Sequence, residues 1–170
     1  MSEISDAIQA KCLAFGDRII KLNDYLLEQA SLKYDAGRQK YNRGSKQHQS
    51  SDISHHTSRV PSSFSPQPSR VPVHLQSVAA LANQLLRSGT SIGANNAEAC
   101  NAITKSDFKS KSYIALKEAR ESLYWIELLH RNSYIDDRQY ESIYGDCEEL
   151  VRILVARCKK LDEQLKQEKK

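Results

Sequence analysis

The apolar residues of this chain recur every three or four positions in four separate stretches, and no other feature constrains its fold as strongly. In each stretch this spacing places them on one face of a helix. The first two stripes are Ile4, Ile8, Cys12, Phe15, Ile19, Leu22 and Leu26, then Leu75, Val78, Ala82, Leu85, Gly89, Ile92, Asn96 and Ala99. The last two are Phe108, Ser112, Ala115, Ala119, Ser122, Ile126 and Leu129, then Ile143, Cys147, Leu150, Leu154, Cys158, Leu161 and Leu165. Short links at residues 100–104 and 131–136 make the last three helices antiparallel neighbours. The sequence therefore predicts an all-α fold, an antiparallel up-down four-helix bundle.

The third and fourth predicted helices begin with residues that cap a helix. Thr104 is followed three residues later by Asp107, which resembles a capping box with Asp in place of the usual Glu or Gln. The fourth helix is expected to start at Asp136 or Asp137. Its acidic residues lie early and its basic residues late, an order that complements the helix dipole.

Between residues 36 and 74 the composition changes abruptly. All four prolines and nine serines lie in this interval, with too few large apolar residues to offset the entropy of ordering. We therefore expect a first helix over residues 1–35, a long disordered loop over residues 36–74, and the other three helices over residues 75–170. Residues 35–74 carry a net charge of +4, equal to that of the whole chain. The loop is either a solvated basic segment or a contact for nucleic acid.

The sequence also disfavours several classes of protein. It contains no run of about 18 apolar residues, which argues against a membrane-spanning helix. Residues 1–10 include Glu3 and Asp6 and lack the pattern of a secretory signal, so we expect a cytoplasmic protein. Phosphate-binding loops, dinucleotide-binding fingerprints, metalloprotease motifs and nucleophile elbows are missing from the sequence. We therefore expect a protein that is not an enzyme and uses no cofactor.

The chain has four cysteines, none of them in a C-x-x-C pair: Cys12, Cys100, Cys147 and Cys158. Three of them fall on the apolar stripes, so we expect reduced cysteines that pack as small hydrophobic residues. The alternative is a zinc site, which would need His55 or His56 from the loop. We expect no metal site.

The second predicted helix contains a run of small residues around Gly89 and Gly93, and each glycine inside a helix costs roughly 1 kcal/mol relative to alanine. Either a neighbouring backbone approaches closely there, or the helix breaks. Asn96 falls on the apolar stripe of the same helix. A buried Asn needs hydrogen-bond partners, and it can specify the register of helix pairing.

The third predicted helix is the most basic ordered element, and flexible cations suffice for contacts with phosphates. The candidate nucleic-acid-binding residues are Lys105, Lys109, Lys111, Lys117 and Arg120. An ordinary solvated face is the alternative interpretation.

Two further sets of residues stand out in the second and third helices. We expect a structural polar network, in which Arg87 and Glu98 bridge to Glu118 or Arg120, comprising Arg87, Asn95, Glu98, Glu118 and Glu121. Four aromatic residues lie off the core stripe and favour a subunit interface, with base stacking as the alternative: Tyr113, Tyr124, Trp125 and Tyr134.

Residues 84–99, Ser106-Asp107-Phe108 and residues 114–129 together resemble the central motifs of a known family. It is the four-helix-bundle family encoded in intervening sequences of bacterial 23S ribosomal RNA genes, which includes the accessory variability determinant proteins of diversity-generating retroelements. The resemblance is close over residues 81–158 and looser from Phe15 to Leu27. Asn96 stands where the family usually has Ile, and residues 36–74 replace a short link.

The resemblance implies a ring-like homo-oligomer, a pentamer in the characterised relatives, and a role facing nucleic acid. In the retroelement branch this role is the binding of a reverse transcriptase and its RNA. We therefore expect a non-enzymatic, homo-oligomeric, nucleic-acid-associated adaptor protein. The alternative is a structural protein–protein interaction module without direct nucleic-acid binding.

Overall fold

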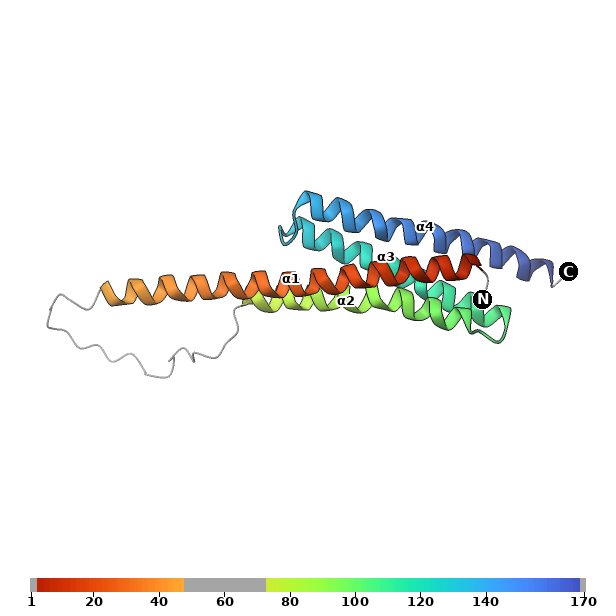
Figure 1. The fold of residues 1–170 in the computed structure, drawn as a ribbon, viewed down its shortest axis with the longest axis horizontal. Coiled ribbons are helices and arrows are strands. Elements are labelled where there is room, and N and C mark those ends of the chain that lie inside the picture. The colour runs from red at the N-terminus through yellow and green to blue at the C-terminus, as the bar shows by residue number, and fades with distance from the viewer. Residues whose placement is uncertain (1–2, 48–72, 169–170) are drawn as a thin grey trace, which may run out of the picture.

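Four helices account for almost all of the chain that the computed structural model describes, which is residues 3–47 and 73–168, with side chains for residues 4–39 and 75–168. They are α1 (Glu3–Gln47), α2 (Val73–Cys100), α3 (Lys105–Arg131) and α4 (Asp137–Gln167), drawn in Figure 1. No strand occurs in these ranges. The predicted all-α four-helix bundle is confirmed.

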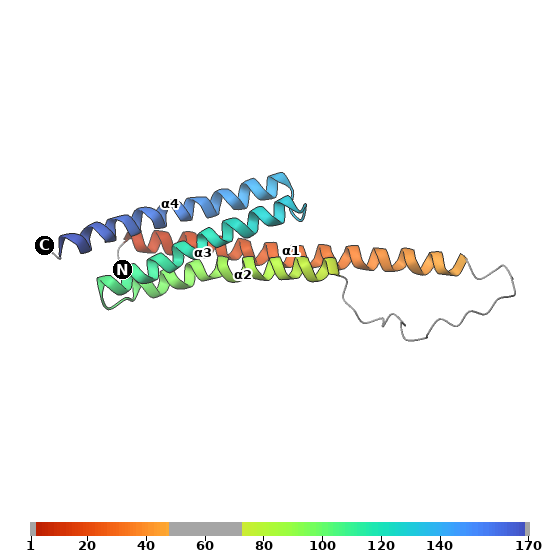
Figure 2. The ribbon, with the colours of Figure 1, turned by 180° about the vertical axis from the view of Figure 1, so that it is seen from behind.

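The helices run up and down, so that each packs against the next one along the chain (Figures 1 and 2). Helices α1 and α2, α2 and α3, and α3 and α4 contact each other extensively, whereas α1 and α4 contact each other much less. The bundle is therefore open along the α1–α4 seam. The start of α1 and the end of α4 lie at the same end of the bundle as the α2–α3 turn.

The core is built from the predicted stripes. Phe15, Ile19, Leu85, Ile126 and Leu154 are among its largest fully buried side chains. The exception is Ile4, which is 72% exposed although its spacing puts it on the stripe of α1. It lies in the first turn of α1, beside the open seam, and α4 does not cover it.

Both predicted helix starts are confirmed. Thr104 caps α3, because its hydroxyl accepts a hydrogen bond from the backbone N–H of Asp107 at 3.1 Å. Asp136 caps α4 with a full capping box. Its carboxylate accepts from the N–H of Gln139 at 2.7 Å, and the amide oxygen of Gln139 accepts from the N–H of Asp136 at 3.0 Å.

Helix α1 does not end near residue 35 as expected but continues to Gln47, so residues 36–47 are helical. This part of the chain has no proline and is rich in Arg, Lys and Gln, which favour helix. Ala36 and Tyr41 are its only apolar residues, and a segment with so few can still form a helix. In agreement, residues 31–39 are exposed apart from the half-buried Tyr34, and α1 projects beyond the rest of the bundle (Figure 1). The remainder of the predicted disordered loop, residues 48–72, lies outside the described residues.

The two glycines of α2 allow α1 to approach closely, and the alternative prediction of a broken helix is wrong because α2 is continuous. A Cβ atom on Gly89 would lie 2.9 Å from Cγ1 of Ile19, closer than real carbon contacts. A Cβ atom on Gly93 would lie 3.4 Å from Cβ of Cys12. The missing side chains therefore set the spacing of the α1–α2 seam.

Within the described ranges, none of the helices combines the length and the apolar character that crossing a membrane requires.

Candidate nucleic-acid interface

The five basic residues predicted to contact nucleic acid do not share one face of α3. Lys105 and Lys109 both reach towards α4. Lys105 forms an ion pair with Glu168, just past the end of α4. The Nζ atom of Lys109 lies 2.6 Å from Oδ1 of Asp162 on α4. These two cations are therefore partly neutralised by carboxylates of the same chain.

Lys111 points the other way and forms an ion pair with Glu98 on α2. Hydrogen bonding to Glu98 raises the pKa of this lysine, with the charge of Glu98 adding to the effect. Lys117 and Arg120 are exposed, and neither forms an ion pair with any residue that the structure describes. They are three residues apart and so lie on the same side of α3.

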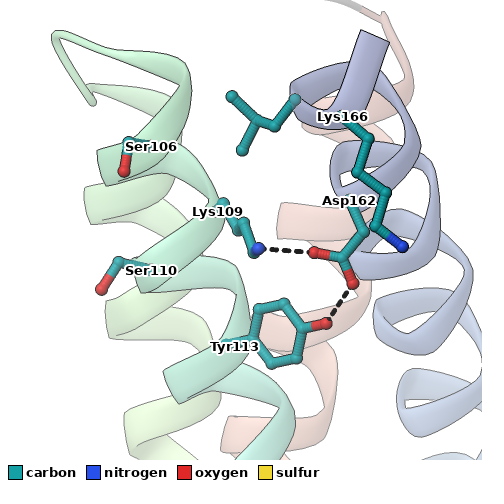
Figure 3. A pocket seen from close by; sticks show the side chains of 7 residues that line it. Ser106, Lys109, Ser110, Tyr113, Asp162 and Lys166 are labelled. Carbon is teal, nitrogen blue, oxygen red and sulfur yellow. Dashed lines mark hydrogen bonds and ion pairs between the residues drawn. The ribbon is translucent and has the colours of Figure 1, made fainter. Parts of the chain in front are cut away.

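A hollow of about 510 Å³ lies between the first turns of α3 and the end of α4 (Figure 3). It is lined by Ser106, Lys109, Ser110, Tyr113, Asp162, Leu165 and Lys166. Lys109 and the hydroxyl of Tyr113, which donates at 2.6 Å, converge on the carboxylate of Asp162. These hydrogen bonds, from Lys109 first and Tyr113 second, hold the pKa of Asp162 below its ordinary value.

The hollow combines two lysines, three hydroxyl groups and a single carboxylate. Lysines and hydroxyl groups are the side chains that bind phosphate oxygens without reading the bases. The ammonium group of Lys109 already forms an ion pair with Asp162, however, so a phosphate would have to displace that carboxylate. Both side chains are half-buried. Ion pairs at the protein surface contribute only about 0–1 kcal/mol, so displacing this carboxylate would cost little free energy.

The residues assigned to a polar network between α2 and α3 lie in separate contacts. Glu98 pairs with Lys111 instead of Glu118 or Arg120. The amide of Asn95 donates to the carbonyl of Ser91 in its own helix at 2.9 Å. The indole N–H of Trp125 donates to Glu121 at 3.0 Å, also within one helix.

Arg87 and Glu118 are coupled by charge alone. Burial raises the pKa of Glu118, Glu121 raises it further, and the nearby Arg87 opposes both effects. No hydrogen bond or ion pair between Arg87 and Glu118 is among the contacts of the described residues. The polar contacts that do join α2 and α3 include the ion pair of Lys111 with Glu98 and the hydrogen bond that the hydroxyl of Ser122 donates to Ser88 at 2.9 Å.

The four aromatic residues predicted to form a subunit interface are used partly inside the chain. Tyr113, Trp125 and Tyr134 pack against the core. Only Tyr124 is largely exposed, at 56%, and it meets the ring of Trp125 edge-on with 4.9 Å between ring centroids. A subunit interface at these four residues stays a prediction.

Asn96, which the sequence places on the apolar stripe of α2, is buried as expected, and its partners are two residues that the sequence did not identify. The side chain of Asn96 is fully buried and donates to Oε1 of Gln9 on α1 at 2.6 Å. Its Oδ1 atom accepts from the guanidinium of Arg157 on α4 at 2.5 Å. That guanidinium also lies over the ring of Phe108, 5.4 Å from its centroid. Asn96 therefore joins α1, α2 and α4 across the core. The sequence signal for these contacts was that a buried Asn requires hydrogen-bond partners.

Burial lowers the pKa of Arg157, and the nearby Cys100, Cys12 and Cys158 act in the opposite direction. This cation forms no ion pair with a carboxylate among the residues that the structure describes. A partly buried guanidinium that contacts an amide oxygen and an aromatic ring but no carboxylate is unusual, because buried charges are normally paired.

The cysteines are free, and Cys12, Cys147 and Cys158 are buried, as predicted for thiols that pack as small hydrophobic residues. Burial raises the pKa of Cys12 to about 11 and that of Cys147 to about 12, so both thiols stay protonated near neutral pH. The described residues contain no group of His, Cys, Asp and Glu that could hold a metal ion. His55 and His56, on which the alternative zinc site depended, lie outside them.

Comparison with known proteins agrees with this architecture. Residues 73–156 match the family described as 23S rRNA-intervening sequence protein. A solved structure, that of a protein of unknown function from the S23 ribosomal protein family of Bacteroides thetaiotaomicron VPI-5482, is similar with a TM-score of 0.63 and 31% sequence identity. The similarity covers 92% of this chain and 98% of that chain. No curated protein matches the chain. The sequence resemblance is thereby confirmed, and the chain belongs to the 23S rRNA-intervening sequence protein family.

Proposed function

We propose that this protein is a non-enzymatic, homo-oligomeric adaptor that binds structured nucleic acid through the basic side of α3. The observation that carries the proposal is the pair Lys117 and Arg120, two exposed cations on one side of α3 that no described carboxylate neutralises. A net charge of +4 for the chain supports an anionic partner.

The binding mode would be contact with the phosphate backbone. Lys and Arg side chains bind phosphates as flexible cations and position a protein on a nucleic acid without reading its sequence. Lys105 and Lys109 lie towards α4 on the same helix and would join the contact once a phosphate replaces Glu168 or Asp162. Specificity would then come from the shape of the folded RNA, as is usual for proteins that contact double-stranded RNA through its backbone.

Two partners are consistent with the family. One is a structured RNA bound directly, as the name of the ribosomal-gene family suggests. The other is the pair of a reverse transcriptase and its RNA, as the resemblance to the retroelement branch implies. A reverse transcriptase gene with a repeat pair beside this gene would favour the second partner, and a location inside a ribosomal RNA gene the first.

The test is the affinity of the protein for a folded RNA fragment, measured by fluorescence anisotropy at several salt concentrations. We expect the affinity of the wild-type protein to fall steeply with salt. The double variant Lys117→Gln/Arg120→Gln should bind more weakly at every salt concentration, and the slope of log K against log salt should be shallower by about 2, since two phosphate contacts are lost.

The matched control is Lys21→Gln/Arg138→Gln, which makes the same change of charge at exposed positions of α1 and α4. It should bind almost as the wild type does. An equal loss in the two double variants, or an affinity that does not depend on salt, would contradict the proposed role of α3.

A structural protein–protein module remains a second candidate, because α1 exposes large apolar residues that a monomer in water does not need. Leu13 and Leu32 are 60% and 56% exposed. Recovery of a single protein partner after complete nuclease treatment, together with no RNA binding, would favour this function over the first.

A further inference from the structure

An apolar groove of about 510 Å³ runs along the open seam between α1 and α4, near the ends of the chain. Ile4 and Ile8 of α1, Phe108 of α3, and Ile153 and Leu161 of α4 form its walls. Its α4 wall extends from Ile153 to Gln164, which corresponds to roughly 16 Å along a helix. A groove of this length leaves apolar side chains in contact with water, as the exposure of Ile4 illustrates.

The charged residues of the groove are both cations. Arg157 and Lys160 line it, and no Asp or Glu is among the described residues that do so. Neither cation forms an ion pair within the described ranges. Lys11 on α1 and Lys109 on α3 differ from these two groove cations, because each of them forms an ion pair with a carboxylate of α4. We call this site the basic groove. It fits an occupant that presents apolar side chains together with carboxylates.

The chain itself carries such an occupant on the exposed side of α1. Apolar and acidic residues alternate there with steps of four and three, which places them on one face: Leu13, Asp17, Ile20, Asp24 and Leu27. Leu13, Ile20 and Leu27 are 60%, 45% and 38% exposed. In the part of the chain that the structure describes, Asp17 and Asp24 form no ion pair. We call these five residues the outer face of α1.

We propose that the outer face of α1 of one copy docks in the basic groove of a second copy of this chain. The proposal rests on the homo-oligomer in the proposed function and names the two surfaces that would form it. Apolar side chains would leave water on both sides, and the aspartates would meet Arg157 and Lys160. The outer face is about 21 Å long, since 14 residues separate Leu13 from Leu27, and so covers the length of the groove.

The two surfaces lie on different sides of the same protomer. Ile4 and Ile8 face the groove next to α4, whereas the residues of the outer face are turned away from the core stripe that contains Ile8. Each protomer therefore offers one groove and one outer face. The contact is head-to-tail, and repeating it produces a closed ring if the rotation per step closes.

The test is the molar mass of the full chain in solution, measured by size-exclusion chromatography with light scattering over a range of concentrations. We expect an oligomer for the wild type. Lys160→Glu reverses one of the two charges of the groove, and Asp24→Lys reverses one of the two charges of the outer face. Each should weaken assembly at least about tenfold, because like charges then meet at that position. Both residues are exposed, and unchanged circular dichroism would show that the variants fold.

A mixture of the two variants provides a sharper readout. The unchanged groove of Asp24→Lys accepts the unchanged outer face of Lys160→Glu, and the two reversed surfaces are complementary again. The mixture should therefore assemble at concentrations at which each variant alone is dissociated.

The matched controls are Lys159→Glu, next to Lys160 but outside the groove, and Glu141→Lys on α4, both at exposed positions. Both controls should assemble as the wild type does. Wild-type assembly that both charge reversals leave intact would overturn the proposed docking and leave the homo-oligomer of the proposed function standing. A wild type that is monomeric throughout would overturn both and leave the groove to an acidic helix of another protein.

Discussion

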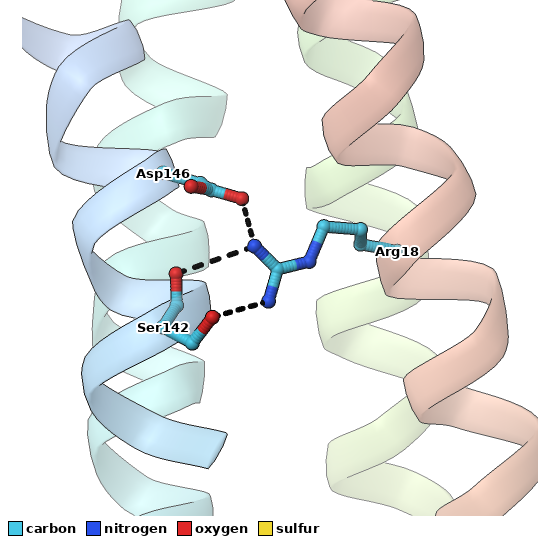
Figure 4. Close-up of polar contacts among 3 residues, drawn as sticks. All are labelled: Arg18, Ser142 and Asp146. Carbon is cyan, nitrogen blue, oxygen red and sulfur yellow. Dashed lines mark hydrogen bonds and ion pairs between the residues drawn. The ribbon is translucent and has the colours of Figure 1, made fainter. Parts of the chain in front are cut away.

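Helix α1 has two neighbours, and its two seams are built in opposite ways. Against α2 it packs closely, with Ile19 and Cys12 directly over the positions where Gly89 and Gly93 lack side chains. Against α4 it is joined by polar contacts at the surface. The guanidinium of Arg18 reaches the carboxylate of Asp146 and, at 2.8 Å, the hydroxyl of Ser142 (Figure 4).

This difference indicates that the α1–α2 seam contributes mainly to stability, whereas the α1–α4 seam is suited to binding. A seam closed by backbone approach leaves no room for another molecule, and its energy comes from close packing. A seam held by exposed ion pairs contributes little to folding, and beside it lie the basic groove and the exposed Ile4. We therefore expect substitutions at the α2 side of α1 to affect folding, and substitutions at the α4 side to affect association.

The largest effect is expected at the closed seam. Gly89→Val places a branched side chain where even a Cβ atom would lie 2.9 Å from Ile19. The resulting overpacking should lower the free energy of unfolding by about 2–3 kcal/mol, as measured by urea denaturation. Gly145→Val is the matched control, because nothing lies within 4 Å of a Cβ atom there, and it should change stability by less than about 0.5 kcal/mol. Equal effects of the two substitutions would show that the seam is not tight.

An intermediate effect is expected at Asn96, which links both sides of α1. Asn96→Ile introduces the residue usual in the family but leaves Arg157 and Gln9 without their shared partner. It should lower the free energy of unfolding by about 2 kcal/mol, since a partly buried charge loses its hydrogen bond. Adding Arg157→Met should restore part of the loss.

Thermal and urea denaturation of the single and double variants measure this coupling. Asn95→Ile, at the adjacent position, is the control. The Asn95 side chain bonds only to the carbonyl of Ser91 in its own helix, so less than about 1 kcal/mol should be lost. Additive effects of Asn96→Ile and Arg157→Met would contradict the link across the core.

The smallest effect is expected at the open seam. Arg18→Gln removes the contacts with Asp146 and Ser142. It should cost less than about 1 kcal/mol at low salt, and the difference from wild type should vanish at high salt because the pair is exposed and screened. Melting temperatures at low and high salt measure it. A loss as large as that of Gly89→Val would mean that the two seams do not differ as proposed.

Much of the fold could be predicted from the spacing of apolar residues alone. Period and capping residues are local properties, so the four helices, the cap at Thr104 and the capping residue Asp136 follow from short stretches of sequence. The end of α1 could not be predicted in the same way. Residues 36–47 contain only Ala36 and Tyr41 as apolar residues, and a pattern this polar does not distinguish a helix from a disordered segment.

The candidate site was harder to predict from the sequence, because it depends on how the helices are rotated relative to one another. A run of lysines shows that α3 is basic, but it does not show that Lys109 meets Asp162 while Lys111 meets Glu98. The need of Asn96 for a partner was visible in the sequence. The identity of that partner was not, because Arg157 is 61 residues away and reaches Asn96 only through the packing of α4.

The start of α1 and the end of α4 lie at the end of the bundle where Ile4 and Gln164 line the groove. An affinity tag joined close to either of these helix ends would therefore stand next to the surface that the assembly experiments probe. A tag inserted after Gln47, at the far end of α1, would be kept away from that surface by the length of the helix itself. A tag beside the groove could block assembly by itself. The molar mass measured for a tagged protein therefore depends on where the tag is placed.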